Sequence, residues 1–247
     1  MVRKRVKKYK QSTHVYVLWT VRCLLIGSIV INLVYIILHL LDQSLTTKSA
    51  QMNAIEENIT ITFWAIVTFA VTFLHDYFEK NKNIHIPDIL ETIIIIFIYA
   101  AIFLSVRFNL YDDVFWWDII LHTASGVILG FIGFLLIYKL NSRHSMNISP
   151  LLVAAFAFTF SVTADVIFEI YEFSMDIIFA TDMQSWNLPA NTIELGKTFQ
   201  GVGLRDTMSD IIFDTLGALS ISIVCFFLYK NDKKKSLKLM HEVFPDK

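Results

Sequence analysis

Six apolar stretches restrict the fold of this 247-residue chain more than any other feature of its sequence. Each is long enough for a helix that crosses the hydrocarbon core of a bilayer, which needs about 20 residues. Strands are not expected, because an isolated strand in lipid leaves its backbone groups unpaired. With 17% charged residues and a mean hydropathy of +0.56, the chain is not an ordinary soluble domain. The expected spans are 15–41, 59–78, 89–108, 114–140, 150–178 and 210–229.

Lysine and arginine residues predict the orientation of these spans, because they gather on the cytoplasmic side of membrane proteins. The N-terminal tail, residues 1–14, and the C-terminal tail, residues 230–247, are both rich in them. The sequence therefore predicts an all-α, polytopic membrane bundle of about six helices with both termini in the cytoplasm. This topology accounts for the basic tails, so membrane lipids and not nucleic acids are the expected partners.

The formal net charge of −1 hides a polarised molecule. On the predicted topology, the cytoplasmic half has 17 Lys and Arg residues against 7 Asp and Glu, a balance of +10. The outer half has 4 Lys and Arg residues against 15 Asp and Glu, a balance of −11. The topology explains the basic side but not the acidic side, so the acidic side is where we look for the function.

Ionisable residues also lie inside the last three spans, where a charge costs at least a few kcal/mol and marks a functional candidate. Within each span their spacing places them on one helix face. They are Asp118 and His122 in the fourth span, Asp165, Glu169, Glu172 and Asp176 in the fifth, and Asp206, Asp210 and Asp214 at the start of the sixth. Most fall near the predicted outer ends. If these three helices are neighbours, the side chains converge on one outward-facing polar cavity.

This predicted cavity contains more carboxylates than bases, so some must be protonated or must bind a cation. Oxygen-rich sites with one imidazole suit Mg²⁺, Mn²⁺ or Ca²⁺, and Zn²⁺ is possible through His122 and two carboxylates. The predicted metal ligands are Asp118, His122, Glu169, Glu172, Asp210 and Asp214, with Asp165, Asp206 and Gln200 in support. The alternative is a hydrated helix end, in which the first-turn acids act as caps.

The predicted external loop, residues 179–209, contains Gly201 and Gly203 beside Arg205. Two interpretations are open for this segment. Either the glycines shape a lid that delivers Arg205 to an anionic group, or the segment is a plain turn into the sixth helix. If the protein is an enzyme, the catalytic candidates are His122, as a general base or metal ligand, and Arg205, as an anion clamp.

The residues of the last three spans resemble those of a known family. Asp118-x₃-His122, Glu169-x₂-Glu172, Gln200-Gly201, Asp206-Thr207-x₂-Asp210 and Gly217-Ala218 are similar to the YjdF-type family of uncharacterised bacterial inner-membrane proteins. Their order also resembles that of VanZ-like membrane proteins, which are associated with glycopeptide antibiotic resistance and usually have Asn where this chain has Asp214. The resemblance implies a helical bundle in the bacterial plasma membrane and carries no established reaction.

Three functions are compatible with these features. The favoured one is a binding protein whose outward-facing, metal-binding cavity holds a lipid headgroup, an antibiotic or an envelope component. The second is a metal-dependent enzyme that acts on a lipid or a lipid-linked phosphate. The third is a cation transporter or a proton-coupled transporter. Two observations argue against transport: the acids all lie in one leaflet, and the short spans interrupted by Gly or Pro that mark many transporters are missing. The sequence does not specify the oligomeric state.

Overall fold

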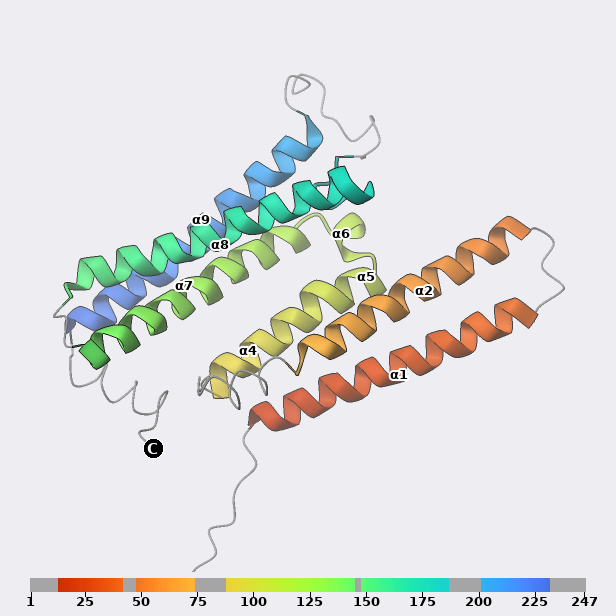
Figure 1. Ribbon diagram of the computed structural model, residues 1–247, viewed down its shortest axis with the longest axis horizontal. Coiled ribbons are helices and arrows are strands. Elements are labelled where there is room, and N and C mark those ends of the chain that lie inside the picture. The colour runs from red at the N-terminus through yellow and green to blue at the C-terminus, as the bar shows by residue number, and fades with distance from the viewer. Residues whose placement is uncertain (1–12, 42–47, 74–87, 145–147, 187–200, 232–247) are drawn as a thin grey trace, which may run out of the picture. The chain divides into compact units, whose positions relative to one another are not determined.

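A computed structural model of the chain (Figure 1) describes residues 13–41, 48–73, 88–144, 148–186 and 201–231. Every regular element within these ranges is a helix. Six helical stretches are long and apolar enough to cross a membrane: His14–Leu41, Gln51–Val71, Asp88–Arg107, Trp117–Asn141, Pro150–Phe179 and Val202–Lys230. The expected all-α fold with six membrane-spanning helices is therefore confirmed. The side of the membrane on which each terminus lies stays a prediction.

Two helices begin earlier than the spans expected for them. Helix α2 (Lys48–Val71) begins before position 59, and α9 (Val202–Asn231) begins before position 210. The additional residues of α2 are too polar for a hydropathy window, but many of them are good helix formers, so this helix continues beyond its apolar stretch. Those of α9 include weaker helix formers such as Gly203, Asp206 and Thr207, so helix propensity does not explain its earlier start. Residues 202–209 are consequently helical and do not belong to the loop expected at 179–209. The expected end of the second span at position 78 lies outside the described residues.

The chain divides into two compact units, the first of which ends at Asp113. In this unit α1 (Thr13–Leu41) packs against α2 and against α4 (Asp88–Ile98). The third span continues from α4 through one π-helical segment, η1 (Tyr99–Leu104), into α5 (Ser105–Arg107), and α6 (Leu110–Asp113) follows. Apolar residues of α1, α2, α4 and η1 form the core of this unit.

A buried arginine of α1 closes the C-terminal end of α2 in the first unit. Arg22 is 6% exposed, and its Nε donates to Thr72 Oγ1 at 3.0 Å. Its Nη2 donates to the backbone oxygen of Thr72 at 2.9 Å, and the guanidinium carbon lies 4.0 Å from the centre of the Phe73 ring. The last carbonyl groups of a helix have no partner within the helix, so this arginine satisfies one that would otherwise be costly in lipid.

The second unit begins at Val114 and contains three long helices, each of which contacts the other two. They are α7 (Trp117–His144), α8 (Pro150–Phe179) and α9. Ser149 caps α8 by accepting a hydrogen bond from the Leu152 backbone nitrogen, and Pro150 occupies the first turn, where its missing N–H costs nothing. Figure 1 shows that α8 runs opposite to α7 and α9. The ionisable parts of α7, α8 and α9 therefore lie at the same end of the unit.

Two glycines allow α7 and α9 to approach each other closely. A Cβ atom on Gly126 would lie 2.2 Å from the backbone oxygen of Asp214, and one on Gly217 would lie 2.2 Å from the backbone oxygen of Thr123. Side chains do not fit at either position, as is common where membrane helices pack without a hydrophobic driving force. The close approach places Asp214 directly beside α7.

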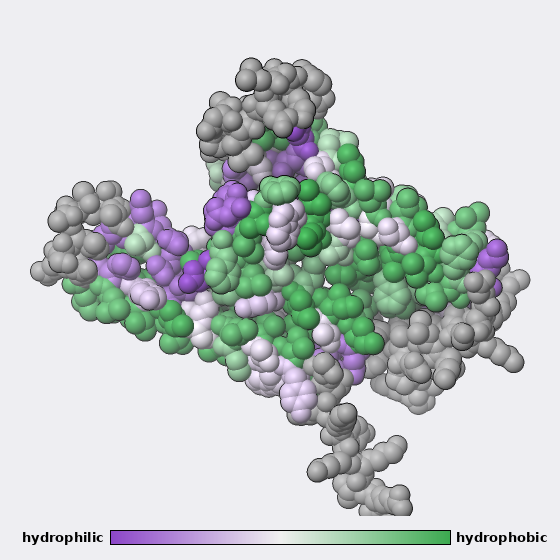
Figure 2. Space-filling view, turned by 180° about the vertical axis from the view of Figure 1, so that it is seen from behind, coloured by the Kyte–Doolittle hydropathy of each residue, from purple (hydrophilic) through white to green (hydrophobic). Residues whose placement is uncertain are grey.

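Apolar side chains cover much of the outside of these helices. Leu41, Phe115 and Ile177, for example, are 71%, 86% and 70% exposed. Figure 2 shows hydrophobic residues over most of the described surface in that view, with hydrophilic residues gathered near helix ends. Apolar surface on this scale is unusual for a soluble monomer and is expected of helices that contact lipid.

Candidate metal centre

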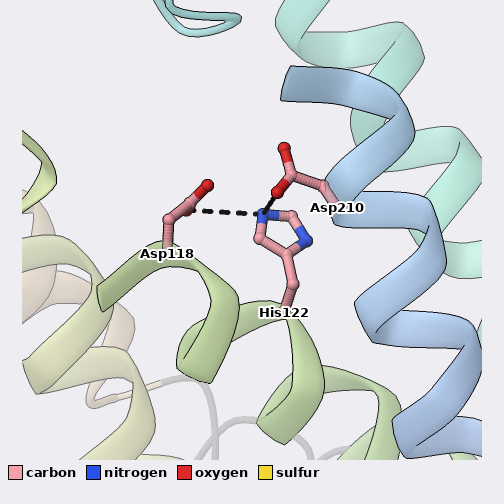
Figure 3. Close-up of side chains that lie close together, drawn as sticks. All are labelled: Asp118, His122 and Asp210. Atoms are coloured by element: carbon pink, nitrogen blue, oxygen red, sulfur yellow. Dashed lines mark ion pairs between the residues drawn. The ribbon is translucent and has the colours of Figure 1, made fainter. Parts of the chain in front are cut away.

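His122 lies at the centre of a polar cluster in the second unit (Figure 3). It is one turn after Asp118 on α7, and its Nε2 atom is 3.6 Å from Asp118 Oδ1. The same nitrogen is 3.8 Å from Oδ1 of Asp210, which comes from α9. The ligand atoms of these three residues all lie within 4.8 Å of one another. Figure 3 shows the two carboxylates converging on the same edge of the imidazole ring from different helices.

The other nitrogen of His122 faces α8. Its Nδ1 atom lies 3.6 Å from Oδ1 of Asp165, a residue that is 3% exposed. Glu169, one turn further along α8, completes a second group whose ligand atoms all lie within 4.8 Å of one another. A carboxylate on the far nitrogen of a histidine is the arrangement that orients metal-binding imidazoles in many metalloproteins.

Several oxygens of this cluster are buried without a hydrogen-bond donor. They are both carboxylate oxygens of Glu169 and the Oδ2 atom of Asp165. The Thr207 side chain is the nearby group that can donate a hydrogen bond to Glu169, although no donor meets ideal hydrogen-bond geometry at either oxygen. Buried polar groups in proteins are almost always hydrogen bonded, so carboxylates in this state need a positive partner or a proton.

The cluster contains much more acid than base. Seven carboxyl groups of the second unit surround His122 or lie within about two helical turns of it. They belong to Asp118, Asp165, Glu169, Glu172, Asp206, Asp210 and Asp214. Among the described residues at this end of the unit, the other basic side chain is that of Arg205, which is exposed and takes part in no described ion pair. The described residues therefore do not neutralise the carboxylates.

Two of the predicted metal ligands lie outside both groups of converging ligand atoms. Asp214, with no exposed surface, accepts a hydrogen bond from Ser125 Oγ at 2.8 Å, and Ser161 Oγ lies 3.5 Å from its other oxygen. Glu172 is 8% exposed and interacts electrostatically with Glu169. Asp165, predicted as a supporting residue, instead belongs to one of the two groups.

The remaining predicted residues lie at the start of α9 or before it. Asp206 is half-buried and close enough to Asp118 to interact with it electrostatically. Arg205 points its side chain to the surface. Gln200 lies outside the described residues. Because α9 begins at Val202, the part of the segment from 202 onward is helical. Residues 187–200 lie outside the described residues, so the lid and the plain turn both stay predictions.

Asp176, the fourth acid on the predicted face of α8, contacts the end of its own helix. The sequence places it on the same face of α8 as the other three acids, but its carboxylate binds the turn that follows the helix. Its Oδ1 accepts from Thr181 Oγ1 at 2.6 Å and from the Met183 nitrogen at 2.8 Å, and its Oδ2 accepts from the Gln184 nitrogen at 3.0 Å. The Gln184 side chain then donates to Thr207 Oγ1 at 2.7 Å, which ties this turn to α9.

Two serines that contact Asp214, Ser125 and Ser161, were not among the predicted site residues. Both continue the ionisable faces, since Ser125 follows His122 by three residues and Ser161 precedes Asp165 by four. That spacing was the available signal, because residues three or four apart share a helix face. A serine within an apolar helix usually bonds to its own backbone, however, so spacing alone does not distinguish a functional serine.

The comparisons with known proteins agree with a membrane protein. The family described as "Predicted membrane protein (DUF2238)" matches residues 21–231, a range that includes the whole cluster. A protein of Thermotoga maritima described as uncharacterised is 26% identical over 149 residues, which are 60% of this chain and 68% of that protein. No solved structure gives a significant match.

Proposed function

The chain belongs to the DUF2238 family of predicted membrane proteins, and we propose that it is a multi-pass membrane protein that binds a divalent metal ion through Asp118, His122 and Asp210. The observation that carries this proposal is the convergence of three ligand atoms, from two helices, within 4.8 Å of one another. Carboxylate and imidazole are the ligand types that Zn²⁺ and Mn²⁺ share, and Mg²⁺ or Ca²⁺ also fits the carboxylates.

The surroundings of His122 favour a metal ion on its Nε2 side. A neutral imidazole carries one proton, and a metal ion requires the nitrogen that lacks it. If that proton is on Nδ1, it points to Asp165, whose Oδ1 atom lies 3.6 Å away. Nε2 then presents its lone pair between Asp118 and Asp210. A cation there also offsets part of the excess negative charge of the cluster.

Three protein ligands leave coordination positions for another molecule, as in catalytic zinc sites. Asp118, at the second position of α7, is 30% exposed and opens the site towards the end of the bundle. On the predicted topology this end faces the outside of a bacterial plasma membrane, where phosphate headgroups lie. We infer that the metal ion binds an anionic group of a lipid or of another envelope component, such as a bound antibiotic.

One observation favours an enzyme as a second candidate function. Glu169 is buried beside the ligand His122, and the nearby group that can donate a hydrogen bond to its carboxylate is the Thr207 side chain. A carboxylate in that state is suited to accept a proton from a water molecule or hydroxyl group activated by the metal ion. The reaction that follows from this chemistry is hydrolysis or transfer of a phosphate-linked group. Cation or proton-coupled transport has no comparable support from a specific contact.

Equilibrium dialysis of the purified full-length protein against Mn²⁺ tests the metal site. We expect Asp118→Asn, His122→Gln and Asp210→Asn each to weaken Mn²⁺ binding by at least about tenfold, which corresponds to about 1.4 kcal/mol. Asp165→Asn should weaken it about 10–100-fold, which is the usual effect of removing a carboxylate behind a ligand histidine. Glu57→Gln is the matched control, because Glu57 is an exposed acid of α2 in the first unit.

Electron paramagnetic resonance of the bound Mn²⁺ gives a second readout that does not depend on affinity. We expect nitrogen hyperfine coupling from one imidazole in the wild-type protein and its loss in His122→Gln. Broadening of the ³¹P signal of inorganic phosphate by the bound Mn²⁺ then tests for an open coordination position. Undiminished Mn²⁺ binding by His122→Gln, with no nitrogen coupling in the wild type, would refute the metal site.

A further inference from the structure

We propose a second cation site, specific for Na⁺, that is formed by the Asp214 carboxylate, the hydroxyls of Ser125 and Ser161, and the backbone carbonyl of Gly126. It goes beyond the function proposed above, since none of its ligands belongs to the site on Nε2 of His122. The four residues come from all three helices of the second unit. Asp214 and Ser161 have no exposed surface.

The distances bring these oxygens together around the Asp214 carboxylate. Ser125 Oγ lies 2.8 Å from Asp214 Oδ1, and Ser161 Oγ lies 3.5 Å from Asp214 Oδ2. Ser161 Oγ also lies 3.0 Å from the backbone oxygen of Gly126. Because a Cβ atom on Gly126 would collide with the α9 backbone, the glycine is what allows this carbonyl and the carboxylate to be neighbours.

The number of protons in this group of oxygens is too small for the number of contacts. Ser125 Oγ is 2.8 Å from the His122 backbone oxygen as well as 2.8 Å from Asp214, and each distance is short enough to need a proton between the atoms. Ser161 Oγ lies 3.0 Å from the Gly126 oxygen, which also needs a proton between the atoms, and its 3.5 Å distance to Asp214 Oδ2 is longer than an ordinary hydrogen bond. Each hydroxyl has one proton, so two protons serve three short contacts. A cation among these oxygens supplies the missing positive charge.

A second observation comes from the next turn of α8. Asp165 is 3% exposed, and its Oδ2 atom is buried without a hydrogen-bond partner. Its charge acts on Asp214, so two acidic groups of adjacent helices reinforce each other's negative field. Among the described residues, the basic side chain beside Asp165 is the imidazole of His122, whose Nδ1 side is directed to the other oxygen of Asp165.

The ligand types select a hard, singly charged cation. Every ligand atom is an oxygen, which suits alkali and alkaline-earth ions and not the softer transition metals. One carboxylate in direct contact balances one positive charge, whereas a divalent ion would leave a net charge in a buried site. Backbone carbonyl oxygens are also among the ligands by which transporters bind Na⁺ near the bilayer midplane. Asp214 lies near the middle of the Val202–Lys230 span.

Thermal unfolding of the purified full-length protein in detergent tests this site. The melting temperature is measured in NaCl, KCl and choline chloride at equal ionic strength, with a chelator present to remove divalent ions. A ligand that binds the folded state raises the melting temperature as its concentration exceeds the dissociation constant. We expect Na⁺ to raise it more than K⁺ or choline does, and we expect Asp214→Asn to abolish the difference.

Three further variants separate this site from the metal centre and from general destabilisation. Ser161→Ala should raise the Na⁺ concentration at half-effect about tenfold or more, because it removes one ligand. Ser222→Ala is the matched control, because Ser222 is also a buried serine but lies outside the proposed site, on α9. This variant should leave the Na⁺ response unchanged. Asp118→Asn should keep the Na⁺ response while losing Mn²⁺ binding, so the two proposals can fail independently.

Broadening of the ²³Na signal by the protein gives a direct measurement if Asp214→Asn does not fold. We expect broadening by the wild type that Ser161→Ala reduces and Ser222→Ala does not. An equal response to Na⁺, K⁺ and choline would overturn the proposal, and so would a Na⁺ response that survives in both Asp214→Asn and Ser161→Ala. Stability that depends on pH but not on Na⁺ would mean that a proton fills this position, and it would also overturn the proposal.

Discussion

Adding one methyl group at Gly126 should disturb both the stability and the metal affinity of the second unit. In Gly126→Ala the new Cβ atom would lie 2.2 Å from the Asp214 backbone oxygen and 2.9 Å from the Ala218 backbone nitrogen. Ordinary contact begins at 3.4 Å, so α7 and α9 must separate by about 1 Å at this point. The colliding atoms belong to the backbone and cannot rotate away. Overpacking of this kind typically costs about 1–3 kcal/mol.

The same separation should weaken the metal centre, although Gly126 contributes no ligand to it. Asp210 is one turn before Asp214 on α9, so a shift of α9 moves its carboxylate relative to His122 on α7. Metal–ligand distances tolerate only about 0.2 Å, much less than a shift of about 1 Å. We therefore expect Gly126→Ala to lower Mn²⁺ affinity by about tenfold or more, a loss of about 1.4 kcal/mol.

The assays are thermal unfolding in detergent and Mn²⁺ dialysis, with another glycine as the matched control. Gly27 lies within α1, and a Cβ atom there would meet nothing within 4 Å. Gly27→Ala should therefore be neutral or stabilising by up to about 1 kcal/mol, because alanine is the better helix former. Equal stability and equal Mn²⁺ affinity in Gly126→Ala and the wild type would refute the reasoning, since α7 and α9 would then not be in close contact.

Two further substitutions test polar contacts at the ends of helices. Asp176→Ala removes a carboxylate that accepts three hydrogen bonds from the turn after α8, so it should lower the free energy of unfolding by at least about 2 kcal/mol while Mn²⁺ still binds. Loss of Mn²⁺ binding in that variant would instead place Asp176 in the metal centre. Arg22→Lys should destabilise the first unit by about 1–2 kcal/mol, because an ammonium group cannot reproduce the two-pronged contact with Thr72. A thermal melt equal to that of the wild type would show that Arg22 does not stabilise the end of α2.

The number and type of the helices could be predicted from the sequence because lipid leaves few alternatives. A long apolar stretch in a bilayer must satisfy its own backbone groups, and the helix is the solution available within a single segment. The ends of the helices were less predictable. Hydropathy marks where a helix enters lipid, but a helix can continue beyond that point. The start of α2 extends through polar residues that favour the helix, whereas the start of α9 includes weak helix formers such as Gly203 and Asp206.

The candidate site was predictable in part, through the spacing of ionisable residues. That spacing placed Asp118 and His122 on one face of α7, where the structure has them. It could not show which acids of α8 and α9 reach the imidazole, because this depends on how closely the helices approach. The close approach depends on Gly126 and Gly217, whose spacing in the sequence gives no sign that they lie at a contact between α7 and α9. The partner of Asp176 was not predictable, because periodicity gives the face of a helix but not the partner of a side chain near its end.

His122 lies between two acidic groups, and a metal ion can bind its neutral imidazole on the side of only one of them. Its Nε2 atom faces Asp118 and Asp210, and its Nδ1 atom faces Asp165. A neutral imidazole has a lone pair on only one of its two nitrogens. If a metal ion binds Nε2, the proton is on Nδ1 and faces Asp165, so no metal ion binds the imidazole on the side of Asp165 and Glu169. Glu169 is then a carboxylate next to the metal centre and not one of its ligands. On this argument Glu169→Gln should preserve Mn²⁺ binding within about threefold, which is a difference of about 0.7 kcal/mol, whereas His122→Gln abolishes it. If Glu169→Gln were as damaging as His122→Gln, the metal ion would have to lie on the Nδ1 side of the imidazole, between α7 and α8.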